Sequence, residues 1–152
     1  MNRILSYIII FLLFTLFGCA YEPILTKKNY QFSVEVSEIT GDQQINSIIK
    51  DRINYRKKNQ KEYQLNLVSK KEKKIISKDS KGDPANFEIL IDVSYSVKRN
   101  DKTILTKNII RKTTYTNITD KFELENYENN IIENLSEGIS DSILSSISEI
   151  NE

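Results

Sequence analysis

The sequence predicts an α+β domain in which a four-stranded, mostly antiparallel sheet carries two amphipathic helices on one face. Three stretches, centred on Val34, Leu65 and Val93, alternate apolar with polar residues as half-buried strands do. Two others, around Ile49 and Ile139, repeat apolar residues at helical spacing. A Thr- and Ile-rich strand precedes the second of these, so the order is strand, helix, strand, strand, strand, helix.

This domain is expected to occupy residues 30–152, after a signal peptide at 1–18 and a short extended leader at 19–29. In the leader, Pro23 disfavours helical backbone at the residue before it. The first strand begins near Tyr30, and its alternation runs from Phe32 to Val36. Gly41 then interrupts the pattern and marks a turn.

Asp42 is placed to cap the first helix, because a carboxylate at that position accepts hydrogen bonds from free N–H groups. The apolar residues that follow share one helix face: Ile45, Ile48, Ile49 and Ile53. We expect this face to pack on the sheet. The alternative, a helix lying on a membrane surface, is disfavoured by its mixed charges and its lack of interfacial Trp.

The second strand is indicated by the alternation of Tyr63, Leu65 and Leu67. Residues 70–74 follow it with four lysines and one glutamate, and this basic run is expected in a turn or loop as a solvated tip. The alternative role is contact with phosphorylated lipid, since clustered lysines act as point charges for phosphate.

A turn at residues 80–84 precedes the longest alternation in the chain. That alternation comprises Phe87, Ile89, Ile91, Val93, Tyr95 and Val97. A tight hairpin is expected at residues 99–102, where Asn100 and Asp101 tolerate positive φ. The strand after it should span 103–115, with a bulge or change of face at Ile109 and Ile110.

From Asp120 the apolar period becomes helical nearly to the C-terminus. The predicted stripe comprises Leu124, Tyr127, Ile131, Ile132, Leu135, Ile139, Ile143, Ile147 and Ile150. Gly138 weakens a helix by about 1 kcal/mol relative to alanine, which indicates a bend or a close packing contact. The serines between Ser136 and Ser148 are expected mainly on the other face, exposed to solvent or a partner.

The N-terminus has the form of a bacterial lipoprotein signal. Arg3 provides the positive flank, and residues 4–17 are apolar apart from Ser6 and Thr15, which is too short a stretch to span a bilayer. Cleavage is expected between Gly18 and Cys19, with diacylglycerol and N-acyl (palmitate-type) modification of Cys19. Lipoproteins held at the inner membrane generally carry Asp after the cysteine. Ala20 therefore predicts an outer-membrane anchor with the domain facing the periplasm.

The composition argues against catalysis, metal binding and nucleic-acid binding. The chain has no histidine, and its only cysteine is assigned to lipid, so neither a His-based triad nor a His-ligated zinc site can form. No Gly-rich phosphate loop is present, because Gly41, Gly82 and Gly138 are isolated. Loss of Arg3 with the signal leaves equal numbers of basic and acidic residues, which disfavours a polyanion partner. We therefore expect no catalytic residues, no metal and no non-covalent cofactor.

The whole mature chain resembles the lipopolysaccharide-assembly lipoprotein (LptE) family. The resemblance rests on Cys19 followed by Tyr21, Pro23 and Ile24, on the strand–helix unit, and on the long hairpin and terminal helix. Residues 111–115, an arginine followed by alternating small polar residues, also resemble that family.

This resemblance implies a non-enzymatic partner that plugs the outer-membrane β-barrel of the lipopolysaccharide translocon, assists its assembly and contacts lipopolysaccharide. The basic residues near the hairpin and last strand are candidates for its phosphates: Arg99, Lys102, Arg111 and Lys112. The alternative is that they are solvated charges protecting the sheet edge. Two other roles remain open, regulation of a cell-wall synthase and service as an auxiliary lipoprotein of a lipid or solute transporter. A leader of only about ten residues favours a partner close to the membrane.

Overall fold

A computed structural model describes residues 32–54 and 62–151 and confirms the predicted α+β fold. The elements follow in the order β1 (Ser33–Gly41), α2 (Gln43–Asn54), β2 (Glu62–Lys78), β3 (Pro84–Arg99), β4 (Lys102–Thr116) and α3 (Lys121–Asn151). Gly18, Cys19 and Ala20 lie outside the described residues, so lipidation, cleavage and sorting stay predictions.

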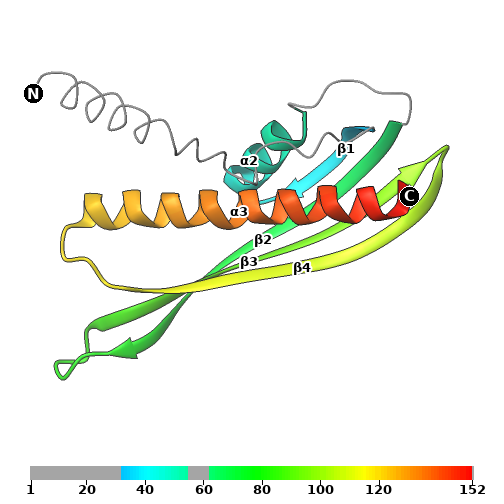
Figure 1. Ribbon diagram of the computed structural model, residues 1–152. Helices are drawn as coiled ribbons and strands as arrows, with labels where there is room; N and C mark the ends of the chain where they lie inside the picture. Colours follow the sequence, from blue (N-terminus) through cyan, green and yellow to red (C-terminus); the bar gives the residue numbers. More distant parts are fainter. Residues whose placement is uncertain (1–31, 55–61, 152) are drawn as a thin grey trace, which may run out of the picture.

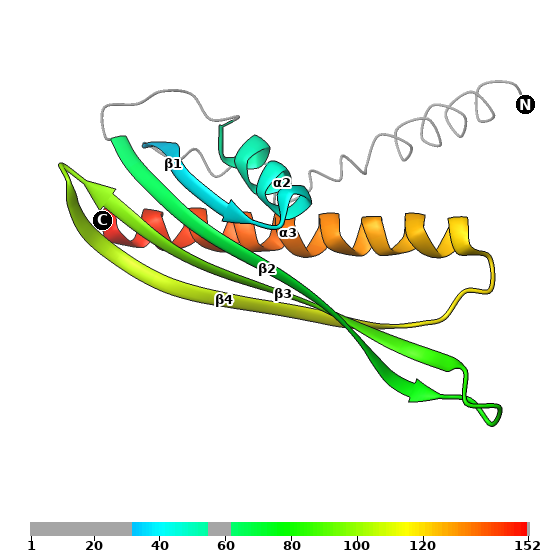
Figure 2. The same ribbon diagram turned by 180° about the vertical axis from the view of Figure 1, so that it is seen from behind.

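The four strands form one mixed sheet in sequential order β1-β2-β3-β4. β1 pairs parallel with β2, and α2 provides the crossover that parallel neighbours require. β2, β3 and β4 pair antiparallel as a long meander. Figures 1 and 2 show both helices on one face, with the end of α3 beside the β3–β4 turn and the β2–β3 turn diverging at the opposite end.

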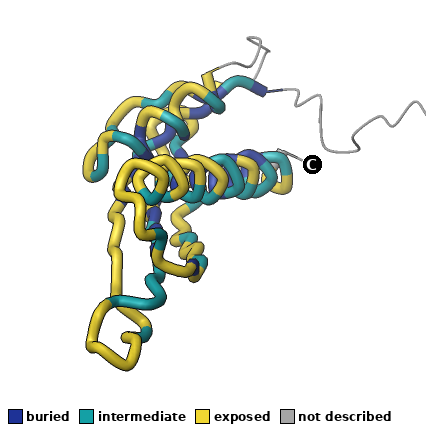
Figure 3. The backbone as a smooth tube through the Cα atoms, turned by 90° about the vertical axis from the view of Figure 1, so that its left-hand side faces the viewer, coloured by how far each residue is buried: buried dark blue, intermediate teal, exposed yellow. Residues whose placement is uncertain are grey.

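The core lies between the helices and one face of the sheet, as the burial pattern in Figure 3 shows. The period of two places the odd-numbered residues of β3 inward, and Ile91, Val93 and Val97 are fully buried there. Ile45, Ile49 and Ile53 of α2 are buried, as the helical spacing predicted, and α2 packs against β1 and α3. The opposite face of the sheet carries no helix within the described residues and is mostly polar.

Residues 70–74 are not the predicted loop but the middle of β2, which continues to Lys78. These residues are extended because each of them pairs antiparallel with a residue of the long strand β3. Successive side chains then point to opposite faces, so Lys71 and Lys73 lie on the helix face while Lys70 and Lys74 lie on the open face. Both faces are polar here, which hid the strand signal.

The hairpin between β3 and β4 is confirmed, with Asn100 and Asp101 at φ +50° and +59°. The bulge predicted at Ile109 and Ile110 is wrong, because both residues pair in register with β3. The irregularity occurs nearer the turn: Val97 pairs with Leu105 and Lys98 with Thr103, so Ile104 is the extra residue. Strongly twisted hairpins accommodate such a bulge near the turn more readily than in mid-strand.

The centre of the predicted α3 stripe is buried, with Ile139, Ile143 and Ile147 at 0% exposure. Its ends are not, since Tyr127 and Ile150 are 45% and 40% exposed. The expectation that the serines face outward is wrong for Ser136 and Ser140, which are fully buried, together with the unpredicted Leu144. α3 contacts both α2 and the sheet, so its buried surface is wider than one stripe.

Gly138 makes the predicted close packing contact. A Cβ atom at this position would lie 2.9 Å from Nη1 of Arg111 on β4. The missing side chain therefore makes room for the guanidinium against the helix. Among the described residues, no helix combines the length and apolar character needed to cross a membrane.

Candidate functional site

The four basic residues predicted to contact phosphate do not gather in one place. Arg99 and Lys102 pair with each other at the β3–β4 turn, where Arg99 lies 5.9 Å from the ring centroid of Tyr63. Arg111 and Lys112 lie nine and ten positions further along β4, which is about 30 Å at ~3.3 Å per residue. Because successive side chains of a strand alternate, Arg111 and Lys112 also lie on opposite faces of the sheet. A single phosphate site built from all four is therefore not present.

The two distant cations already have partners. Arg111 donates from Nη2 to Ser142 Oγ at 3.0 Å, across the space that Gly138 leaves. On the open face, Lys112 Nζ lies 2.9 Å from a carboxylate oxygen of Glu88. Both side chains lie against their own domain, and each links β4 to a neighbouring element.

Two lysines of the basic run meet acidic groups on the helix face. Lys71 lies 3.1 Å from Asp42 and donates to Gln44 Oε1 at 3.3 Å, at the start of α2. Lys73 forms an ion pair and hydrogen bond with Glu128 of α3 and stands 4.5 Å above the Phe87 ring. Adjacent inward positions of one strand thus reach two different helices.

Around Lys73 an aromatic cluster joins β3, β4 and α3. Phe87 and Tyr115 are cross-strand partners whose rings stack at 5.6 Å, and Tyr127 meets Tyr115 edge-on at 5.9 Å. The Tyr115 hydroxyl donates to Glu128 Oε1 at 2.6 Å. Glu128 therefore accepts from both a phenol and an ammonium. Burial, together with this bond and the carboxylate charge, raises the pKa of Tyr115 well above its usual range.

Asp42 links the start of α2 to β2. Its carboxylate accepts from the Ile45 N–H at 3.1 Å, the predicted cap, while its own N–H donates to Ser69 Oγ at 3.0 Å. Ser69 in turn donates to Asn46 Oδ1 at 2.7 Å within the core. Burial alone would raise the pKa of Asp42, but the Ile45 N–H bond and the nearby Lys71 outweigh it and hold that pKa below its usual value.

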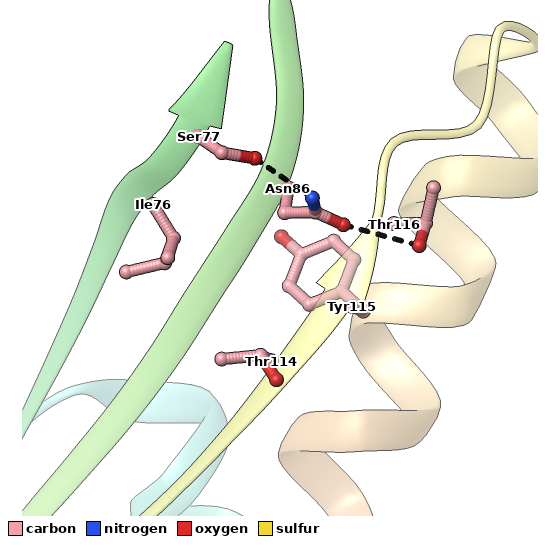
Figure 4. A pocket seen from close by; sticks show the side chains of 6 residues that line it. All are labelled: Ile76, Ser77, Asn86, Thr114, Tyr115 and Thr116. Carbon is pink, nitrogen blue, oxygen red and sulfur yellow. Dashed lines mark hydrogen bonds between the residues drawn. The ribbon is translucent and has the colours of Figure 1, made fainter. Parts of the chain in front are cut away.

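Two shallow hollows adjoin these clusters. One, of about 250 Å³, lies between α2, β2 and α3 with a floor of Ile89 and Ile132 and walls that include Lys71, Lys73 and Glu128. The other, of about 360 Å³, lies at the far end of the sheet beside Tyr115, where Asn86 bonds Ser77 and Thr116 (Figure 4). Within the described ranges, no group of three or more His, Cys, Asp or Glu side chains is placed to hold a metal ion.

The ionisable side chains of this region are engaged with one another. The inward lysines are paired with carboxylates, and the phenol of Tyr115 is held in its neutral form. Sequence reasoning missed Tyr115, Glu128 and Lys73 as a cluster, because they lie on three elements far apart in the chain. The register at the hairpin turn would not have revealed the pairing of Phe87 with Tyr115 either, because the extra residue Ile104 shifts the ladder by one position.

We expect Tyr115→Phe to lower the free energy of unfolding by about 1.5–3 kcal/mol near neutral pH, since it removes a hydrogen bond to a charged acceptor. The folded pKa of Tyr115 lies above its unfolded value of about 10, so its contribution is complete below about pH 10 and is lost as the pH rises from there. Urea unfolding at several pH values should therefore show a shallower alkaline decline in the variant. Tyr127→Phe, at an exposed ring, is the control. It should change the free energy of unfolding by no more than about 0.5 kcal/mol and should leave the alkaline decline of that free energy unchanged.

The fold is shared with solved lipoprotein structures at low sequence identity. Rare lipoprotein B from Shewanella oneidensis aligns with a TM-score of 0.56 and 13% identity, covering 79% of this chain and 99% of the other. Lipoprotein B from Nitrosomonas europaea gives 0.56 and 17%, covering 82% and 91%. A minor lipoprotein from Acinetobacter baumannii gives 0.52 and 9%, covering 77% and 93%. No protein-family model and no curated protein sequence matches the chain.

Proposed function

We propose that this protein is an outer-membrane lipoprotein that partners and plugs the β-barrel lipopolysaccharide translocon, assisting its assembly and the insertion of lipopolysaccharide. The observation that carries the proposal is the combination of a lipoprotein signal ending at Cys19 with a domain fold found in solved lipoproteins. Neither part is sufficient alone, because an anchor does not specify a role and the fold does not specify a partner.

The surface of the domain supports a plug role on physical grounds. The interior wall of an outer-membrane barrel is polar, so a plug must offer hydrogen-bonding groups to it. The open face of the sheet does so with residues such as Asn108, which bonds Asp92 and Ser94, and Asn66, which bonds Glu38. Balanced charge allows such a face to lie against mixed donors and acceptors without net repulsion. On this proposal the protein has no catalytic activity of its own.

The test is purification of a C-terminally tagged protein from detergent-solubilised outer membrane. We expect a large β-barrel protein in equal amount, with lipopolysaccharide in the same complex, and mass spectrometry should find acyl groups on Cys19. The Cys19→Ala variant should lose the acyl groups and the outer-membrane location while the domain still folds. Recovery of a transpeptidase would favour cell-wall regulation instead, and recovery of a transporter subunit would favour an auxiliary role. Either result, or an unmodified Cys19, contradicts the proposal.

A further inference from the structure

Within residues 32–54 and 62–151, the sheet has one long, regular free edge, and it belongs to β4. The other outer strand, β1, has 9 residues and an irregular register between Val36 and Glu38. Beyond the end of β1, the free part of β2 is lysine-rich and its register with β3 breaks twice after Ile75. Short strands, bulges and lysines are the usual protections of an edge. In contrast, β4 pairs with β3 without interruption from Thr116 to Leu105.

The phase of the β3–β4 ladder shows which backbone groups of β4 are free. Asn117 N–H donates to Ala85 C=O at 2.8 Å, one pair beyond Asn86 and Thr116. In an antiparallel ladder, hydrogen-bonded pairs alternate with non-hydrogen-bonded pairs. The odd-numbered residues of 105–115 therefore bond β3. The even-numbered residues, among them Thr106 and Ile110, direct their N–H and C=O groups outward along the free edge.

The cations of β4 do not guard this edge. Arg111 bonds Ser142, Lys107 Nζ bonds Ser146 Oγ at 3.3 Å and lies 4.0 Å from Glu149, and Lys112 pairs with Glu88, so none of these three side chains covers the outward backbone groups. Arg111 and Lys107 nevertheless remain exposed on the helix face of the sheet, where a carboxylate on an added strand can reach them. Beside the edge, Ile110 is 57% exposed. An added strand would cover that apolar surface and satisfy the outward backbone groups at once.

The charge of β4 selects the occupant. Its 15 residues include Lys102, Lys107, Arg111 and Lys112 and no Asp or Glu. A second copy of β4 would bring like charges together across the new pair, which is destabilising. An acidic segment would instead meet Lys107 and Arg111, which are four positions apart on one face.

We propose that the free edge of β4 binds an extended acidic segment of a partner protein by antiparallel strand addition. The segment carries carboxylates four residues apart, opposite Arg111 and Lys107, and a β-branched or other apolar side chain next to the first carboxylate, opposite Ile110. This goes beyond the proposed membrane function, because it concerns how a protein segment is held, whatever the membrane complex in which the partner lies.

The test uses the purified full-length protein in detergent and a labelled synthetic peptide of Thr and Val with two glutamates four positions apart. We expect binding, measured by fluorescence anisotropy, to be at least about tenfold weaker when lysines replace the two glutamates, a difference of about 1.4 kcal/mol. Thr106→Pro removes one outward N–H without touching the β3 ladder, whereas Thr106→Val removes the same hydroxyl and keeps the N–H. We expect Thr106→Val to bind normally and Thr106→Pro to lose at least about tenfold in affinity.

A second pair of variants tests peptide binding at the β4 edge even if Thr106→Pro weakens the fold. Ile110→Glu should abolish binding, because it removes apolar cover and repels the acidic peptide. Val68→Glu places the same charge at a 46% exposed position of the same face, away from the β4 edge, and should leave binding unchanged. Equal binding by the two Thr106 variants in folded protein, equal losses from Ile110→Glu and Val68→Glu, or self-association through β4 with no peptide binding would each overturn the inference.

Discussion

Replacing Gly41 with alanine is expected to lower the free energy of unfolding by about 3–5 kcal/mol, enough to unfold a marginally stable domain. A Cβ atom at this position would lie 1.9 Å from the carbonyl oxygen of Ser69, and φ is +104°, where side chains are strained. The obstacle is backbone on the neighbouring strand, so relief requires β1 to move away from β2. The same movement would disturb Asp42, which caps α2 and bonds Ser69.

Gly82→Ala is the matched control for this experiment. Gly82 also has a positive φ, +89°, but nothing lies within 4 Å of the position its Cβ would take. Only backbone strain remains, so the expected loss is about 1–2 kcal/mol. Urea unfolding followed by circular dichroism measures both variants. Equal losses at the two glycines would show that the contact with Ser69 does not restrict β1.

Truncating Ile143 to alanine is expected to cost about 2–5 kcal/mol, because it removes buried methyl groups and leaves a cavity. Ile143 is 0% exposed at the centre of the α3 surface that packs on the sheet. Ile150→Ala, in the same helix but 40% exposed, should cost less than about 1 kcal/mol. Thermal and urea unfolding provide the comparison. A similar loss at both positions would mean that α3 is not held by its central isoleucines.

If both expectations hold, the stability of the domain resides in the half of the sheet that carries both helices. The far end contributes less, because only α3 reaches it and Phe122, Ile75 and Ile76 are at least half exposed there. This division suits the proposed role. The covered half maintains the fold, while the open face and the β4 edge stay available to a partner.

Periodicity predicted the elements whose two faces meet different surroundings. The alternation from Phe87 to Val97 marks β3 because one face packs under α3 and the other is polar. It failed for residues 70–74, where lysine and glutamate occupy both faces of β2. It also failed for Ser136 and Ser140, since a one-stripe pattern cannot describe a helix buried against both a sheet and a second helix.

The candidate site was less predictable than the fold. Arg99, Lys102, Arg111 and Lys112 are close in sequence, yet a strand separates its residues by about 3.3 Å each and turns alternate side chains to opposite faces. These four residues are therefore further apart in space than their closeness in the sequence indicated. Conversely, Lys73, Tyr115 and Glu128 are distant in sequence and meet in space, because hairpin register and helix docking bring three elements together.

By itself, the sequence determined the order of the strands and helices, the apolar faces that form the core, and the hairpin turn, and it predicts a lipoprotein signal that ends at Cys19. These follow from local patterns of polarity and from turn residues, whose physics acts over a few neighbouring positions. Only the tertiary structure decided the length of β2, the partners of each lysine, the packing of Arg111 against Gly138, and the free edge of β4. Those features depend on strand register and helix placement, which arise from contacts between residues far apart in the chain.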